Sequence, residues 1–240
     1  MSIPAPTPRV HGLHGFHGLH GLLLLVLLPL VVACTPRTTT PPEPTAPPSS
    51  TPHPSAHPPP HPFSWPVPAG WRSETIPFPL DFAPELPYRG VEELRFAPGF
   101  FDEAAPGFWS YAFAWSLERG GPALTLPQLQ ADLRVYFVGL ARAVAEGRFE
   151  THPEGVTAEL RAVATPEPGV TRFSGRLRVF DAFKTRRELG LDVEGRIFAC
   201  GDRTVLLLAA SPSPSPSPSP SHDSPMWQGL LACMAAFRCE

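Results

Sequence analysis

Residues 108–117, FWSYAFAWSL, decide the fold. Large aromatic or aliphatic residues fill one set of alternate positions, and mostly Ser and Ala fill the other set. Because successive side chains of a strand point to opposite faces of a sheet, this period of two predicts a β-strand. We expect the bulky face to be packed core beneath a helix; the alternative is that it lines the site of a hydrophobic ligand. The bulky set is Trp109, Tyr111, Phe113, Trp115 and Leu117.

The segments on either side of this strand have the periods of further strands and of two helices. One helix is expected from the capping residue Thr125 to about Ala145, and a second over residues 225–238. Alternating or uniformly apolar runs predict the other strands, and Gly195 suggests a bulge within one of them. These strands are expected at residues 73–78, 91–96, 156–164, 171–180, 189–193 continuing as 196–200, and 204–210.

The expected elements follow one another in the order β-β-β-α-β-β-β-β-α. Runs of strands separated by turns and helices favour an α+β domain, in which a twisted, mainly antiparallel sheet is packed by two helices. This order resembles that of the PsbP/Mog1-like class of sandwich. The resemblance implies a fold only, because a fold by itself does not carry an activity.

Proline marks the borders of this domain. The chain has 240 residues and 35 prolines, most of which lie in residues 36–62 and 212–225. The first block has almost no apolar side chains, so we expect residues 34–62 to be a tether that cannot build a core. The Ser-Pro repeat at residues 211–225 is expected to be a surface loop. We therefore expect a single globular domain at residues 63–240.

Residues 22–34, LLLLVLLPLVVAC, are an apolar run that ends in a small residue and a cysteine. The end of this run, Val31, Val32, Ala33 and Cys34, resembles the lipobox of bacterial lipoprotein precursors. The resemblance implies that residues 1–33 are a signal peptide and that Cys34 is acylated, which anchors the exported chain in a membrane. The run is shorter than the roughly 20 residues that a spanning helix needs.

The residue after the expected acylation site bears on location. Because Thr35 follows Cys34, and not Asp, the same resemblance implies the outer membrane in a Gram-negative cell. A cleaved secretory signal with Cys34 in its propeptide is the alternative. The leader departs from the class in its charge, since Arg9 is its only Lys or Arg and a His-Gly repeat fills residues 11–22. We expect no metal site in that repeat.

Three cysteines remain after Cys34, and in an exported protein two of them are expected to pair. Cys233 and Cys239 would lie about 9 Å apart along a continuous helix, which is too far for a disulfide. We prefer the pair Cys200 and Cys239; the alternatives are Cys200 with Cys233, and three free thiols. No spacing matches a zinc or redox motif, so we expect no metal or cofactor.

The one charged feature of the sequence that suggests a type of partner is a basic strand face. Arg172, Arg176 and Arg178 share a face of the strand expected at residues 171–180 and could bind an anion, such as a lipid headgroup, a glycan or an acidic protein surface. The next strand is acidic, and we favour charge pairing between the two strands over binding. The net charge of −3 and the expected export argue against nucleic acid as a partner.

No motif of a known catalytic class is present in the sequence. Glu92 and Glu93 are neighbours in an expected strand, so they point to opposite faces and cannot act as a catalytic pair. We expect Glu93 to form a salt bridge with Arg95. Asp102 and His152 are isolated in the sequence.

We therefore favour a non-enzymatic, lipid-anchored envelope protein that binds or assembles with another envelope component. One alternative is an anchored hydrolase, which needs Glu92 or Glu93 to meet Asp102 and His152 in one cleft. The other is a small-molecule or lipid carrier that uses the aromatic face of residues 108–117.

Overall fold

The computed structural model describes residues 63–213 and 223–240 of the chain. The predictions for the signal peptide, for Cys34 and for the tether lie outside the described residues. Most of the Ser-Pro repeat, residues 214–222, also lies outside them.

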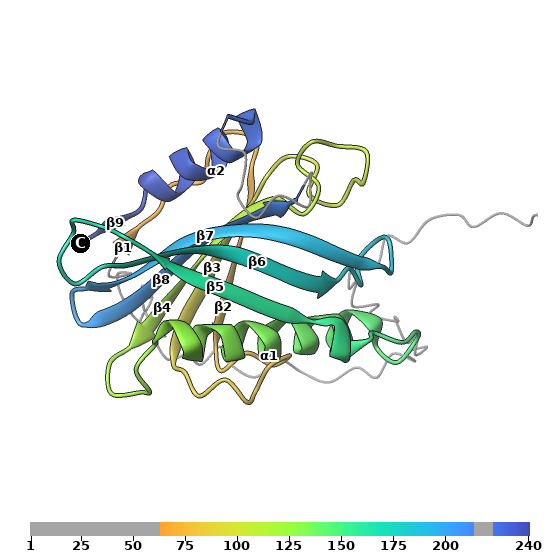
Figure 1. Cartoon of the computed structure of the whole chain (residues 1–240), viewed down its shortest axis with the longest axis horizontal. Helices are drawn as coiled ribbons and strands as arrows, with labels where there is room; N and C mark the ends of the chain where they lie inside the picture. The colour runs from red at the N-terminus through yellow and green to blue at the C-terminus, as the bar shows by residue number, and fades with distance from the viewer. Residues whose placement is uncertain (1–62, 214–222) are drawn as a thin grey trace, which may run out of the picture. The chain divides into compact units, whose positions relative to one another are not determined.

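A seven-stranded sheet forms the centre of the described domain (Figure 1). Its strands lie in the order β2-β3-β4-β8-β7-β6-β5, and every neighbouring pair is antiparallel. Two helices, α1 and α2, pack on it, and the short strands β1 and β9 pair separately. The elements are β1 Phe63–Ser64, β2 Arg72–Phe78, β3 Gly90–Phe96, β4 Tyr111–Glu118, α1 Leu126–Ala145, η1 Pro153–Gly155, β5 Thr157–Val163, β6 Thr171–Phe180, β7 Glu188–Cys200, β8 Arg203–Pro212, α2 Pro225–Ala235 and β9 Arg238–Cys239.

This architecture confirms the predicted α+β class, with a mainly antiparallel sheet and two helices. Leaving aside the two-residue strands β1 and β9 and the short η1 turn, the elements follow the predicted order. The Thr125 side chain caps α1 by accepting a hydrogen bond from the backbone N–H of Gln128, as expected for this residue type.

The two helices lie on opposite faces of the sheet (Figure 1). Helix α1 packs against β5 and β6, and α2 packs against β8 and β4. Gly139 lets α1 lie close to the connection between β2 and β3, because a Cβ atom there would lie 1.9 Å from the backbone oxygen of Phe82. Because α1 and α2 cover opposite faces, the sheet is the middle layer of three.

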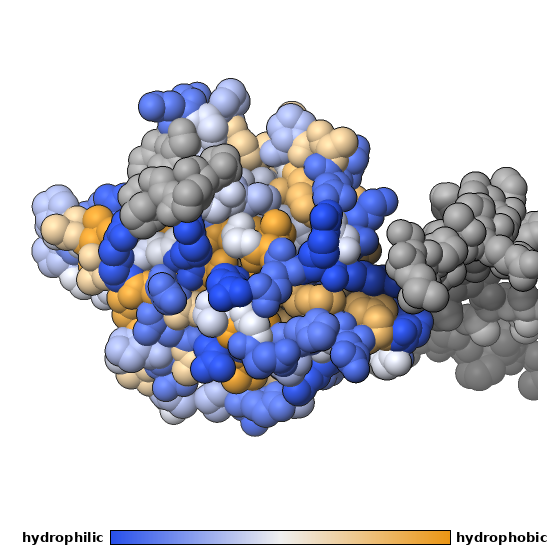
Figure 2. Space-filling model, turned by 45° about the vertical axis from the view of Figure 1, so that its right-hand side comes forward, coloured by the Kyte–Doolittle hydropathy of each residue, from blue (hydrophilic) through white to orange (hydrophobic). Residues whose placement is uncertain are grey.

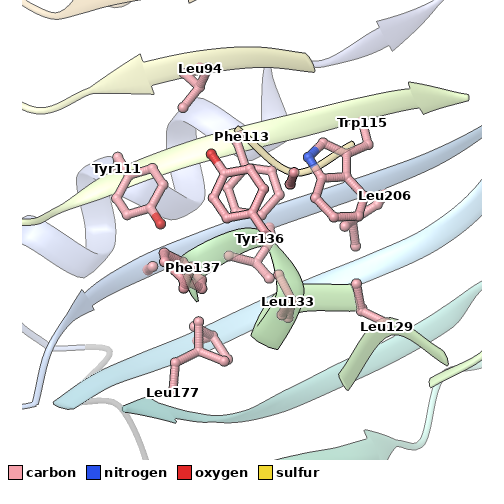
Figure 3. Packing of buried hydrophobic residues seen from close by; sticks show 14 of the residues in the cluster. Leu94, Tyr111, Phe113, Trp115, Leu129, Leu133, Tyr136, Phe137, Leu177 and Leu206 are labelled. Atoms are coloured by element: carbon pink, nitrogen blue, oxygen red, sulfur yellow. The ribbon is translucent and has the colours of Figure 1, made fainter. Parts of the chain in front are cut away.

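Strand β4 divides its side chains between the two faces as the period of two predicts. The bulky residues belong to the larger core cluster on the α1 side. There the ring of Phe113 stacks on that of Tyr136, with 6.1 Å between the ring centroids (Figure 3). Ala112 and Ala114 belong to a second cluster beneath α2. The regular strand begins at Tyr111 and not at Phe108, since Trp109 has a φ of 48° that interrupts the extended backbone.

The predicted bulge at Gly195 is wrong. Strand β7 is continuous, and Gly195 pairs one to one with Phe173 on β6 and with Leu208 on β8. The glycine instead makes room for an aromatic ring, because a Cβ atom at this position would lie 2.4 Å from Cζ of Phe173. A glycine is therefore needed at position 195 for packing against Phe173, and it does not mark a bulge.

The C-terminal helix is shorter than predicted, and the chain after it forms a strand. Helix α2 ends at Ala235, and β9 pairs with β1 so that Phe63 lies opposite Cys239. The Phe63 ring stacks on that of Phe237 with 5.0 Å between the ring centroids. The two ends of the described domain are thus held side by side.

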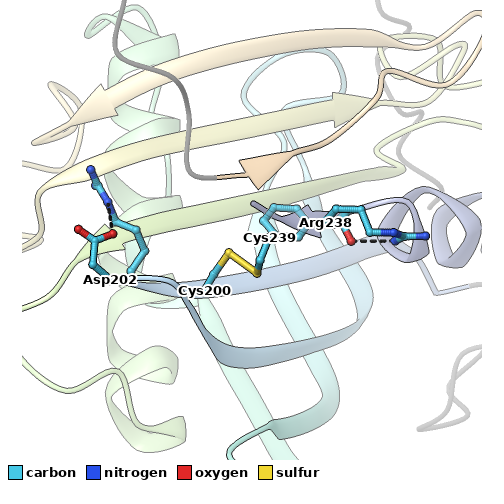
Figure 4. The surroundings of a disulfide bond; sticks show 6 residues. Cys200, Asp202, Arg238 and Cys239 are labelled. Atoms are coloured by element: carbon cyan, nitrogen blue, oxygen red, sulfur yellow. Dashed lines mark hydrogen bonds and ion pairs between the residues drawn. A yellow bond between two sulfur atoms is a disulfide. The ribbon is translucent and has the colours of Figure 1, made fainter.

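A disulfide joins Cys200, at the end of β7, to Cys239 in β9, with 5.4 Å between the two Cα atoms (Figure 4). This is the pair preferred from the sequence. Cys233 is a buried free thiol on α2, and burial raises the pKa of this thiol to about 11. The indole N–H of Trp65 donates to the backbone oxygen of Cys233 at 2.8 Å and ties the N-terminal segment to α2.

Candidate functional site

Helix α2 covers only part of its face of the sheet. It packs on β8 and β4, whereas the same side of β5, β6 and β7 carries mostly polar and charged side chains. We call this set the open face. Figure 2 shows hydrophilic residues over much of the surface turned to the viewer, with hydrophobic residues between them. By strand register the open face comprises Glu159, Arg161, Val163, Arg172, Ser174, Arg176, Arg178, Asp192, Glu194 and Arg196.

Two of the three arginines considered as a possible anion-binding face are engaged within the protein. The guanidinium of Arg176 donates to Oδ1 of the buried Asp192 at 3.1 and 3.2 Å, and the Ser213 hydroxyl donates to Oδ2 of the same carboxylate. Arg178 forms an ion pair with Glu188 at 2.5 Å. Both pairs are the charge pairing between strands that the sequence analysis favoured over binding.

Arg172, the third of these arginines, is exposed and forms no hydrogen bond or ion pair within residues 63–213 and 223–240. It lies directly opposite Arg196 in the register of β6 and β7. The Nε atom of Arg196 is buried and lacks a hydrogen-bond partner in the described structure, while its guanidinium lies 4.9 Å from the ring centroid of Phe198.

Charge and burial act together on Arg196. Burial lowers its pKa, the nearby charges of Arg172 and Arg238 lower it further, and only Glu167 acts in the opposite direction. We call Arg172, Arg196 and Arg238 the arginine group: Arg172 is the Cα partner of Arg196, and Arg238 is near enough for its charge to lower the pKa of Arg196.

A pocket of about 630 Å³ lies beside this arginine group, between the open face and the C-terminal half of α2. Its size falls in the range of small-molecule sites, which is about 300 to 1,000 Å³. One side is charged and the other is apolar. The lining residues are Arg161, Val163, Glu167, Arg172, Phe173, Ser174, Glu194, Gly195, Arg196, Leu231, Met234 and Ala235.

Arg161, Arg196 and Arg238 were not part of the basic strand face predicted from the sequence. The signal for the first two was present, because the alternation of β5 and β7 places them on the same side as Arg172 once the register is known. Arg238 was placed in a helix, and only its position in β9 brings its charge near Arg196.

The acids proposed for a hydrolase do not come together. Glu92 is fully buried in the α1-side core, whereas Glu93 is on the other face and forms the expected salt bridge with Arg95 at 2.9 Å. Asp102 accepts a hydrogen bond from the backbone N–H of Ala104 in an exposed loop. His152 is exposed and faces Glu154 at 3.3 Å. The described residues hold no group of three or more His, Cys, Asp or Glu side chains that could bind a metal ion.

Glu92 is the most strongly perturbed carboxyl group of the described domain. Burial raises its pKa to about 7, although a hydrogen bond from the indole N–H of Trp115 at 3.0 Å and the nearby Tyr136 hydroxyl lower it. Its second oxygen, Oε2, lacks a hydrogen-bond partner in the described structure. Glu92 is fully buried and lies among core aromatic side chains, where it accepts the hydrogen bond of Trp115.

The aromatic face of β4 is packed core. Trp109, Tyr111 and Trp115 are each at most 3 % exposed, and none of them lines either described pocket. The aromatic side chains on which the carrier hypothesis depends are therefore buried in the core.

Comparisons with known proteins assign the chain to no family. Within the described residues, no helix is long and apolar enough to span a membrane. No protein-family model matches the chain, and no curated protein matches it.

Proposed function

We propose that this chain is an exported, lipid-anchored binding protein of the bacterial envelope, that it catalyses no reaction, and that its open face is the binding surface. The observation that carries the proposal is the pocket of about 630 Å³ between the open face and α2, with its excess of arginine side chains. The dispersed positions of Glu92, Glu93, Asp102 and His152 support a role without catalysis.

The anchor in this proposal is Cys34, acylated after removal of residues 1–33, and the Pro-rich residues 34–62 link it to the domain. In a Gram-negative cell the location proposed is the outer membrane. The order of strands and helices is in keeping with a PsbP/Mog1-like sandwich, which we propose as the fold class without drawing an activity from it.

The test is photo-crosslinking in cells that produce the full-length chain. A photoreactive amino acid in place of Glu159, which is exposed on β5, reports on the open face, and one in place of Arg142, which is exposed on α1, is the control. We expect a discrete adduct with an envelope component from position 159, at a yield at least tenfold above that from position 142. The adduct should be lost when Cys34→Ala removes the anchor.

Two results would contradict this proposal. Equal yields from positions 159 and 142 would mean that the open face is not the binding surface. An adduct that persists unchanged in the Cys34→Ala chain would mean that the anchor does not bring the protein to its partner.

A further inference from the structure

The arginine group beside the pocket is arranged unfavourably for the protein alone. Arg172 and Arg196 are Cα partners on adjacent antiparallel strands, and like charges directly opposite each other destabilise a sheet. Arg238 adds a third positive charge near Arg196. The charges of the open face farther along the same strands are instead arranged as complementary pairs, Arg176 with Asp192 and Arg178 with Glu188.

Two acids, Glu167 and Glu194, line the pocket with the arginines. Glu167 is exposed in the turn between β5 and β6, and it is the one carboxylate that raises the pKa of Arg196. Glu194 also lines the pocket and has its own interactions. The Nε atom of Arg196 is still left without an acceptor among the described residues. A bound anion would accept hydrogen bonds from the terminal guanidinium nitrogens of Arg172 and Arg196, which both line the pocket, and would reduce the repulsion between the two groups.

The opposite side of the pocket is apolar. Leu231 and Met234 lie three positions apart on α2, so they occupy the same side of the helix and both line the pocket. On the sheet side, Val163 of the edge strand β5 is the Cα partner of Arg172, lines the pocket and is 41 % exposed. A ligand that reaches from the arginines to these residues would bury apolar surface as well as neutralise charge.

We propose that the pocket binds an amphiphilic anion, in which a carboxylate or phosphate group lies between Arg172 and Arg196 and an apolar body lies against Leu231 and Met234. This inference rests on the proposed function and names the class of ligand for its binding surface. A free metabolite and a lipid headgroup with its attached chain share this chemistry.

The test is isothermal titration calorimetry of the full-length chain carrying Cys34→Ser, which removes the acylation site. The probes are octyl phosphate below its micelle concentration, inorganic phosphate and octanol. We expect octyl phosphate to bind at least tenfold more tightly than either of the other two, because only octyl phosphate engages both sides of the pocket.

Substitutions test which residues bind the anionic group of the ligand and which bind its apolar body. Arg172→Ala together with Arg196→Ala should weaken octyl phosphate binding at least tenfold, because charge-assisted hydrogen bonds are lost. Leu231→Ser should weaken octyl phosphate binding but leave inorganic phosphate unchanged. Arg142→Ala is the matched control, since Arg142 is an exposed arginine on α1, on the other face of the sheet, and it should leave the affinity within twofold.

The arginine variant also carries a check on folding. Because it removes a pair of opposed like charges, it should melt at or above the wild-type temperature, so weaker binding cannot be ascribed to unfolding. Sedimentation of Cys34→Ser chains with phosphatidylglycerol vesicles separates the two sources. If the Cys34→Ser chain binds vesicles and the added Arg172→Ala and Arg196→Ala substitutions abolish this binding, the ligand is a lipid headgroup. If the Cys34→Ser chain binds octyl phosphate but no vesicles, the ligand is a soluble amphiphile.

The inference is overturned if octyl phosphate fails to bind at millimolar concentration, or if it binds the arginine variant as tightly as the wild type. Either result would leave the proposed function standing, provided that the crosslink from position 159 is observed. Loss of that crosslink with intact octyl phosphate binding would instead remove the envelope partner and keep the ligand site.

Discussion

Replacement of both Cys200 and Cys239 by serine should lower the free energy of unfolding by about 3 to 4 kcal/mol. The two cysteines are 39 residues apart, so the disulfide restricts a long loop in the unfolded chain. For a domain of this size the loss corresponds to a fall in melting temperature of roughly 10 °C. Thermal unfolding followed by circular dichroism, with and without a reducing agent, measures it.

The matched control for this prediction is Cys233→Ala, which keeps the disulfide and removes the buried free thiol. It should respond to the reducing agent as the wild type does, whereas the double serine variant should not respond at all. Because burial raises the pKa of Cys233 to about 11, little reactive thiolate forms at neutral pH and exchange with the disulfide should be slow. A wild-type melting temperature that is the same with and without reductant would contradict the prediction.

Replacement of Glu92 by glutamine should change how stability depends on pH. The pKa of Glu92 is raised from about 4.5 to about 7 by burial, so the folded chain keeps a proton that the unfolded chain releases. The free energy of unfolding of the wild type therefore falls as the pH rises from about 4.5 to about 7, and this contribution is level above that range. Over the whole interval it amounts to roughly 3 kcal/mol.

Urea unfolding of Glu92→Gln and of the wild type at a series of pH values tests this prediction. Glutamine keeps an acceptor for the indole N–H of Trp115 and carries no charge, so the variant should be similar to the wild type at pH 4.5 and more stable at pH 8. Glu150→Gln, which alters an exposed carboxylate, is the control and should follow the wild-type curve. Parallel curves for Glu92→Gln and the wild type would show that Glu92 ionises in the folded protein as it does in the unfolded chain.

The architecture of the domain was accessible from local patterns. The alternation of residues 108–117 predicted both the strand and the division of its side chains between two faces, because a period of two is a property of the extended backbone. The capping residue Thr125 predicted the start of α1 for an equally local reason.

Features that depend on register and tertiary packing were not accessible in this way. Gly195 looked like a bulge because the sequence does not show that the ring of Phe173 fills the space beside it. Glu92 was known to face one side of the sheet, but its burial among Trp115 and Tyr136 depends on how α1 packs. The pocket combines residues from β5, β6, β7 and α2, which no single segment reveals.

The pairing of β1 with β9 determines where mechanical load enters the domain. A pull on the chain that precedes Phe63 acts first on β1, whose hydrogen-bonded neighbour is β9. Cys239 in β9 is covalently joined to Cys200 at the end of β7, an interior strand of the sheet, so tension that reaches β9 passes into the sheet through a covalent bond. With the disulfide intact, β9 is held in place covalently and β1 pairs with a fixed strand. Once the disulfide is reduced, the two-residue pairing of β1 with β9 and the stacked rings of Phe63 and Phe237 carry the load.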